Sequence, residues 1–371
     1  MTETCVLAPE FISEKSEGEG AAKSDSRIFE IDPLRDPRWK TFLDGRADAA
    51  IFHRPEWLQA LKSCYGYEPR VLSSTPPGEA LANGLVFCEV QSPLTGKRIV
   101  SVPFSDHCEP LINNAEELQA LLQNLMGRVE RGEQRYIEVR PIELAMQPTT
   151  AFAISQEYYL HRLDLRHSEE KLFRSFHKDC VQRKIRRAER ESLRYEEGSA
   201  EMLLKHFYKL LIMTRRRQGV PPQPIKWFRT LISSLGSKLK IRVALLGETP
   251  IASILTISDR RTMVYKYGCS DPRFNNLGGT HFLFWRAIQE AQASGVVEEF
   301  DLGRSETNNS GLVTFKEHWA AKRFALNYWR YPADAAVLGP ERAITHIRKF
   351  ISVLPDAPLV ALGRLLYPHI G

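Results

Sequence analysis

The chain has 371 residues and a net charge of +6, and 43% of its residues are hydrophobic. This length exceeds one ordinary domain and suits two domains of about 150 residues each plus extensions. The sequence shows no basic, apolar secretory signal and no run of about 18 apolar residues, so we expect a cytoplasmic protein without a membrane span.

The six cysteines are scattered, without C-x-x-C spacing or neighbouring pairs of histidines. Structural zinc sites and disulfide frameworks need such clustering, so the sequence predicts reduced cysteines and no metal site. Cys269 lies beside a predicted strand, where a small buried apolar side chain is several times more common than a catalytic thiol.

The ends of the chain differ from its middle. Residues 1–26 are rich in Glu, Ser and Gly and have little to bury, so we expect a disordered leader. Two α/β units are predicted at 27–160 and 161–332, followed by a helical tail at 333–371 with a helix from Glu341 to Val353. The tail has many apolar residues and few charges; packing onto a domain is its expected role, and contact with a membrane surface is the alternative.

The two units show the same order of elements. Each begins with a strand, a Gly-Glu turn and a strand, at Glu68–Val90 and again at Ile241–Ile257. Asp106 and Asp271, which follow the next strand of each unit, lie 165 positions apart, as do the predicted helix starts. We infer a duplicated α/β unit, each copy a mixed twisted sheet flanked by helices. The matching segments are Arg98–Asp106 with Thr262–Asp271, and the helices Ala115–Arg131 with Thr280–Ala293.

A strand at Tyr158–Leu165 is predicted to cross from the first unit to the second, and a basic amphipathic helix follows it. The segment from Lys171 to Arg190 has eight Lys or Arg against two acids, with apolar side chains at helical spacing. A solvated face with snorkelling side chains is the ordinary explanation of such a helix. The functional alternative is contact with the phosphates of a substrate or donor, for which the candidates are Arg183, Lys184, Arg186 and Arg187.

The most informative stretch is Met263–Trp319. It predicts a strand, the turn NNLGGT, a helix, a second strand and a loop leading to GLVTFKEHW. The first N–H groups of a helix and its positive dipole end attract anions such as phosphate, and a residue without Cβ allows their close approach. Gly278, Gly279 and Thr280 are therefore the predicted anion-binding residues, with Thr280 capping the helix. A plain turn between strand and helix is the alternative.

The run from VYKYGCSDPRFNNLGGT to FDLGRS, with GLVTFKEHW after it, resembles the acyl-donor half of the GNAT acyltransferase fold in its FemA/FemB-like branch, the peptidoglycan bridge-forming aminoacyltransferases. The basic segment HKDCVQRKIRRAER resembles that branch as well, and the similarity extends from Arg27 to Tyr331. The turn NNLGGT differs from the Q/R-x-x-G-x-G/A signature of the fold. The resemblance implies tandem GNAT-like domains, of which the first shapes the acceptor side and the second holds the donor.

The resemblance also implies direct acyl transfer to an amine, without a covalent enzyme intermediate. Such transfer needs a positioned donor, loss of a proton from the amine and a stabilised oxyanion. Lys316 is placed by the resemblance to stabilise the transition state or the donor phosphates, and backbone N–H groups near Tyr267 and Gly268 are expected to hold the donor carbonyl. Asp106 is a candidate base or acceptor-binding residue, and Arg304, at a strand end, is a candidate for substrate binding.

The expected acceptor is an amine on a phosphate-bearing cell-envelope or polysaccharide precursor, met in the cytoplasm or at the inner face of the membrane. No permanently bound cofactor is expected. The donor is acyl-CoA or aminoacyl-tRNA: the glycine turn favours acyl-CoA, and the basic segment fits tRNA. The tRNA-using members often carry a long helical hairpin, and the sequence has no segment of that kind, which favours acyl-CoA.

Two hypotheses from other classes compete with this one. A non-enzymatic nucleic-acid-binding protein would use the basic segment on phosphates, but this leaves the duplicated unit unexplained. A degenerate transferase with an interaction role is the other, and the incomplete glycine signature is the evidence for it.

Overall fold

A computed structural model describes residues 27–142, 151–334 and 351–370. Its described part forms one twelve-stranded sheet with the strand order β1-β2-β3-β4-β5-β12-β6-β11-β10-β9-β8-β7. The strands are β1 Phe29–Ile31, β2 Glu68–Ser73, β3 Leu85–Ser92, β4 Gly96–Val100, β5 Ile137–Val139, β6 Ala153–Asp164, β7 Arg194–Gly198, β8 Leu239–Leu246, β9 Thr249–Asp259, β10 Thr262–Ser270, β11 Glu299–Glu306 and β12 Lys322–Tyr331.

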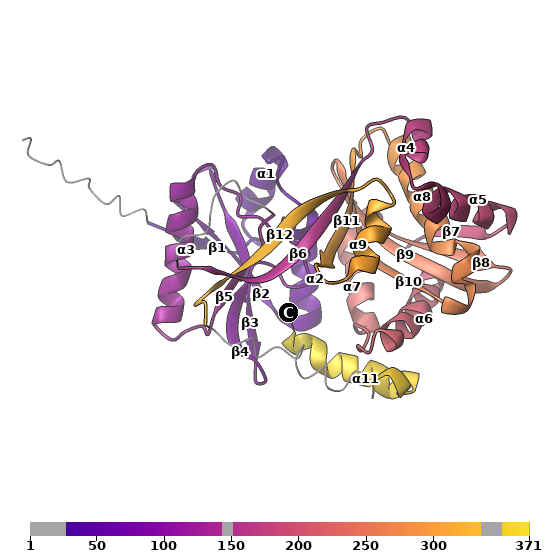
Figure 1. Ribbon diagram of the computed structural model, residues 1–371. Helices are drawn as coiled ribbons and strands as arrows, with labels where there is room; N and C mark the ends of the chain where they lie inside the picture. Colours follow the sequence, from indigo (N-terminus) through magenta and orange to yellow (C-terminus); the bar gives the residue numbers. More distant parts are fainter. Residues whose placement is uncertain (1–26, 143–150, 335–350, 371) are drawn as a thin grey trace, which may run out of the picture.

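The helices lie on both faces of this sheet (Figure 1). They are α1 Pro37–Gly45, α2 Pro55–Tyr65, α3 Ala115–Glu130, α4 Glu169–Ser175, α5 Arg183–Arg190, α6 Glu201–Arg217, α7 Ile225–Leu235, α8 Gly279–Ala293, α9 Ser310–Glu317 and α11 Asp356–Leu366. No helix in the described parts has the length and apolar character needed to cross a membrane.

The order of the strands confirms the duplication. The N-terminal half, β1 to β5, and the C-terminal half, β7 to β11, lie on opposite sides of a central pair, β6 and β12 (Figure 1). In both halves the last two strands are parallel, β4 with β5 and β10 with β11, and each pair is connected through a helix, α3 or α8. A parallel pair requires such a crossover, which is why the two copies keep the same spacing in the sequence.

The crossing strand predicted at Tyr158–Leu165 is confirmed and has a counterpart. β6 follows the N-terminal half yet pairs with β11, and β12 follows the C-terminal half yet pairs with β5. The two strands also pair with each other over most of their length. This exchange joins the two halves through backbone hydrogen bonds. It therefore fixes the position of one half relative to the other.

Three large apolar clusters, and a small fourth one between β6 and β12, lie in the described structure. The largest lies between the halves and combines side chains of α1, α2, α6 and α7 with one face of the sheet. A second packs α5 and α8 against the C-terminal half, and a third packs α3 against the N-terminal half. Buried Trp57 and Trp227, whose rings meet edge to face at 5.5 Å, connect α2 with α7 across the boundary.

The expected basic helix is not continuous. Its segment forms α4, then a π-helical turn at Lys178–Gln182, then α5. Phe176 and His177 have extended backbones (ψ 147° and 127°), which breaks the helix before the turn. The expected cap is also wrong, because α8 begins at Gly279 and its N-cap is Gly278.

The tail packs on the domains. Helix α11 extends along the edge of both halves (Figure 1), and a Cβ on Gly363 would lie 2.0 Å from the carbonyl oxygen of Pro222, so the helix needs glycine at this contact. The hydroxyl of Tyr67 donates to the carbonyls of Tyr367 and Pro368 at 3.1 Å. Most of the helix predicted at Glu341–Val353, and the whole predicted leader, lie outside the described residues.

Candidate active site

The C-terminal half opens between its two parallel strands. β10 and β11 pair only from Thr262 to Val264, opposite Glu299 to Asp301, although β10 continues to Ser270 and β11 to Glu306. A β-bulge between Tyr265 and Tyr267 interrupts the pairing of β10 with β9 at the same level. Because a bulge bends its strand, the two strands diverge beyond Val264.

A cavity of about 280 Å³ lies at the far end of β10. Gly279 and Thr280, at the start of α8, line it together with Lys184 of α5. It thus combines free helix N–H groups, the positive end of the helix dipole and an ammonium group, the features that bind phosphate. Two of the three residues predicted in the turn and one predicted in the basic segment therefore meet here.

Gly278 brings the turn and the basic segment together. Its φ of 79° is in the left-handed region, and a Cβ at this position would lie 2.3 Å from the carbonyl oxygen of Lys184. Any other L-residue would strain the backbone and push α5 away from α8. Gly278 is therefore needed for the contact that places Lys184 at the cavity.

The other predicted basic residues have different neighbours. Arg183 lies 3.6 Å from Asp179, and Arg187 lies 3.3 Å from Glu191, both as pairs one helical turn apart. Arg186 lies over the Phe173 ring, 5.4 Å from its centroid. Exposed pairs of this kind contribute little to stability, so Arg183 is a matched control for Lys184.

A second cavity, of about 460 Å³, lies between the two halves on the other side of the opening. Five basic and two acidic side chains line it, contributed by both halves: Arg140, Arg215, Lys266, Arg304 and Arg330 with Asp106 and Glu138. Within the described structure, Nε of Arg215 and Nε of Arg330 are buried and have no hydrogen-bond partner. Buried donors are normally satisfied, so this cavity is suited to an anionic ligand.

Asp106 lies on a strained loop after β4. Val102 and Phe104 have φ values of 58° and 61°, and a β-branched residue rarely adopts such a conformation. Arg140 braces the loop by donating to the carbonyls of Val102 and Ser105. Strain of this kind persists only where the surroundings impose it, and it gathers at functional sites.

Lys266 reaches Asp106 from the other half. Its Nζ lies 3.1 Å from Oδ2 of Asp106 and 5.2 Å from the centroid of the Phe52 ring. Burial lowers the pKa of Lys266, and the charge of Asp106 opposes this shift. Lys266 is not among the residues predicted from the sequence. It shares the buried face of its strand with Val264, and a lysine on such a face was the available signal.

Arg304 also lies close to Asp106. Its Nη1 donates to the Tyr328 hydroxyl at 2.7 Å, and that hydroxyl donates to the backbone carbonyl of Asp106 at 2.7 Å. Arg304 is also 3.8 Å from the Asp106 carboxylate. Asp106 and Arg304, which were predicted separately, thus lie together although 198 positions separate them in the sequence.

Tyr267 is buried beside the same cavity. Its hydroxyl accepts a hydrogen bond from Nε1 of Trp227 at 2.9 Å. Burial raises the pKa of Tyr267, so its hydroxyl stays protonated at neutral pH. A protonated phenol can donate one hydrogen bond, which is the chemistry of an oxyanion partner and excludes a phenolate base at this position.

Lys316, for which a role at the donor is predicted, lies on the buried side of helix α9. It is only 2% exposed, and its Nζ donates to the carbonyls of Gly303 at 2.7 Å and Arg304 at 2.9 Å. Burial lowers its pKa to about 8. Through these two hydrogen bonds, Lys316 fixes helix α9 to β11. The same helix places Leu312 at the cavity between the halves and Thr314 at a further cavity beside the one that contains Gly279 and Lys184.

A third cavity, also about 460 Å³, is related to the second by the duplication. Asp301 of β11 faces Arg162 of β6 there, as Glu138 of β5 faces Arg330 of β12. His107 lies between two carboxylates: its Nε2 is 3.1 Å from Asp301 and its Nδ1 is 2.9 Å from Glu109. Burial alone would lower the pKa of His107, but Glu109 and Asp301 raise it to about 10.

Because the pKa of His107 is raised in the folded protein, the stability of the protein should depend on pH. The folded pKa of His107 lies above the unfolded value of about 6.5, so its contribution is complete below pH 6.5 and is lost as the pH rises towards 10. Relative to His107→Gln, the free energy of unfolding of the wild type should fall by at most about 1.4 kcal/mol per pH unit in this window. Urea titrations at several pH values measure the difference, and a constant difference would contradict the charged histidine.

Comparisons with known proteins agree with this architecture. Residues 174–317 match the family described as acetyltransferase (GNAT) domain. The crystal structure of FemX superposes on the chain with a TM-score of 0.63 at 13% identity, over 81% of this chain and 96% of that chain. The L-PGS structure from Bacillus licheniformis gives 0.52 at 11% identity, over 86% and 98%.

A tandem GNAT protein from the clavulanic acid biosynthesis pathway gives a TM-score of 0.51 at 9% identity, over 84% of this chain and 98% of that chain. The comparison with curated proteins gives no match. Sequence identities this low show a common fold and do not identify a substrate. Residues 174–317 therefore match the GNAT acetyltransferase domain family, and the chain as a whole has the fold of tandem GNAT proteins.

Proposed function

We propose that this protein is an N-acyltransferase that transfers an activated acyl or aminoacyl group to the amine of an anionic, phosphate-bearing acceptor of the cell-envelope or polysaccharide type. One observation carries the proposal: two cavities lie on either side of the place where β10 and β11 diverge. One cavity, at the start of α8, is suited to phosphate, and the other is basic and contains Asp106. The first contains Gly279, Thr280 and Lys184, and the second has five basic side chains against two acidic ones.

The donor is acyl-CoA in this proposal. Its pyrophosphate lies at the start of α8 beside Lys184, and its acyl arm enters between β10 and β11, where the strands no longer pair. Backbone groups of β10 near Tyr267 and the Tyr267 hydroxyl then face the carbonyl oxygen. GNAT domains typically use acyl-CoA, and the described part of the chain contains no long helical hairpin.

The acceptor amine approaches from the basic cavity. Its phosphates are held by Arg215 and Arg330, whose Nε groups otherwise lack partners, and its ammonium group binds the Asp106 carboxylate. Asp106 first takes one proton from this ammonium group, and the neutral amine nitrogen then attacks the acyl carbon. The new C–N bond forms, the C–S bond breaks, and a second proton from the nitrogen passes to the leaving thiolate, which departs as the free thiol. Lys266 and Arg304 hold Asp106 in place.

Release of free thiol from acyl-CoA tests the proposal. UDP-glucosamine and glucosamine differ in the nucleotide diphosphate, and we expect a lower KM for the charged amine because Arg215 and Arg330 bind its phosphates. Asp106→Asn should lower kcat/KM about a hundredfold or more, whereas Asp334→Asn, at an exposed position, should change little. Equal rates with both amines, or an active Asp106→Asn variant, would contradict the assignment.

A further inference from the structure

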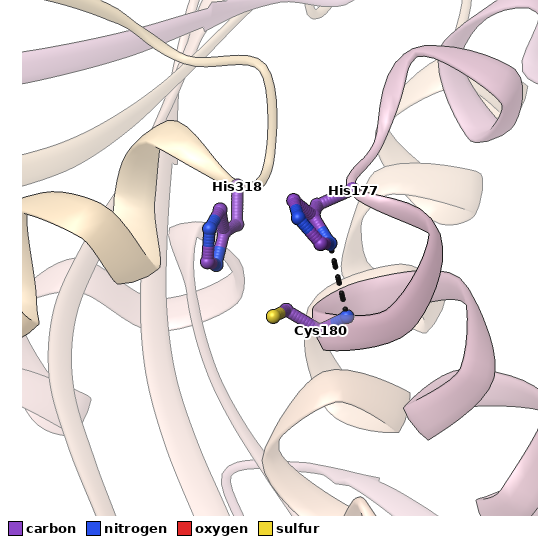
Figure 2. Close-up of side chains that lie close together, drawn as sticks. All are labelled: His177, Cys180 and His318. Carbon is purple, nitrogen blue, oxygen red and sulfur yellow. Dashed lines mark hydrogen bonds between the residues drawn. The ribbon is translucent and has the colours of Figure 1, made fainter.

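Three potential metal ligands meet at the edge of the donor side, a group that the sequence analysis did not predict. His177 and Cys180 belong to the start of the π-helical turn, and His318 follows α9, 138 positions after Cys180. Their ligand atoms all lie within 4.8 Å of one another. In Figure 2 the two imidazole rings face each other and the Cys180 thiol lies below them on the same side.

Backbone contacts keep the two segments together. The N–H of His177 donates to the carbonyl of His318 at 2.8 Å, and the ring centroids are 4.3 Å apart with an angle of 45° between the planes. These contacts keep the two imidazole rings close together, so both rings can offer a nitrogen to one metal ion.

We propose that His177, Cys180 and His318 form a binding site for a divalent metal of the zinc type. Two imidazole nitrogens and one thiolate are a ligand set that zinc prefers, and tetrahedral coordination would bring the ligand atoms to about 3.3–3.6 Å from one another. The ligand atoms lie within 4.8 Å of one another, and side-chain rotation can bring them to coordination distance because His177 is exposed and the other two residues are half-buried.

One hydrogen bond opposes binding. Nδ1 of His177 accepts the N–H of Cys180 at 3.2 Å (Figure 2), and the ring cannot keep this bond while Nε2 binds a metal as a neutral imidazole. A single helix cap contributes little compared with coordination by three protein ligands. The expected site therefore binds metal and releases the cap of the π-helical turn.

The three-residue cluster lies next to the proposed donor site, so a bound metal is expected to affect donor binding. Cys180 and His318 line a cavity of about 320 Å³ together with His281 and Phe315, and these two residues also line the cavity that contains Gly279. A metal bound there draws α9 towards the π-helical turn and narrows the space between the two cavities. Zinc should therefore weaken donor binding, and this coupling rests on the proposed function.

Cobalt is the probe for the site itself. Titration of the reduced protein with Co²⁺ should give one equivalent of bound metal and a thiolate-to-cobalt absorption band, which zinc then removes. Cys180→Ser should abolish the band, and His318→Ala should weaken zinc binding about a hundredfold or more. Cys64→Ser and His167→Ala, which lie outside the cluster, should bind as the wild type does.

Two outcomes would overturn the site: no thiolate band in the wild type, or equal zinc affinity of the Cys180→Ser variant. The second measurement compares zinc affinity with and without acyl-CoA, since the two effects are reciprocal. Zinc affinity that is unchanged by bound acyl-CoA overturns the coupling. Failure of acyl-CoA to bind counts against the proposed function alone, because the cobalt and zinc titrations test the metal site in the absence of any donor.

Discussion

Replacing Lys316 with methionine is expected to lower the transfer rate about a hundredfold while the protein stays folded. Methionine keeps most of the apolar stem but removes the two donors to the Gly303 and Arg304 carbonyls. Each unsatisfied buried carbonyl costs about 1–3 kcal/mol, partly offset because an ammonium group is no longer buried. Without the tether, β11 and α9 are free to shift, and a displacement of about 1 Å suffices for a hundredfold loss.

The position of Lys316 makes it a positioning residue, so the measurement must separate geometry from folding. kcat and KM are compared at a temperature at which circular dichroism shows the variant fully folded, and the loss should appear mainly in kcat. Lys322→Met introduces the same change at an exposed position of β12 and should leave both constants unaltered. A fully active Lys316→Met variant would remove Lys316 from the working site.

The second large effect concerns the donor. Acyl-CoA at a hundred times its dissociation constant should stabilise the wild type by about 2.7 kcal/mol, and Gly279→Val should abolish this gain. A Cβ at Gly279 would lie 3.1 Å from Cβ of Ala252 and 3.3 Å from Cδ1 of Ile251, so valine fills the turn at the point where the pyrophosphate approaches. Thermal unfolding with and without acyl-CoA measures the gain.

Because valine also crowds the contact with β9, a second variant is needed. Lys184→Ala leaves the glycine turn unchanged and should weaken acyl-CoA binding, whereas Arg183→Ala, the neighbouring residue with only an exposed ion pair, should not. Aminoacyl-tRNA would instead show affinity that falls steeply with salt and depends on both residues. Salt-sensitive binding of charged tRNA, without any shift by acyl-CoA, would show that the preference for a CoA donor is wrong.

The sequence by itself determined the duplicated unit, the parallel strands with their crossover helices and the glycine turn at α8. These features depend on local periodicity, on turn residues and on spacing, all of which are present within short windows of the chain. It also located the crossing strand at Tyr158–Leu165. It missed the break of the basic helix at Phe176 and His177, because extended backbone there is imposed by packing and leaves no mark in the apolar spacing.

Only the tertiary structure decided how the candidate site is assembled. The exchange of β6 and β12 brings Asp106 to Lys266 and Arg304, 160 and 198 positions away. Lys316 is buried because its ammonium group finds two β11 carbonyls, which no local pattern specifies. The metal-type cluster has the same origin: His318 meets His177 and Cys180 through packing of distant elements, and coordination depends on distance in space, which spacing along the chain does not encode.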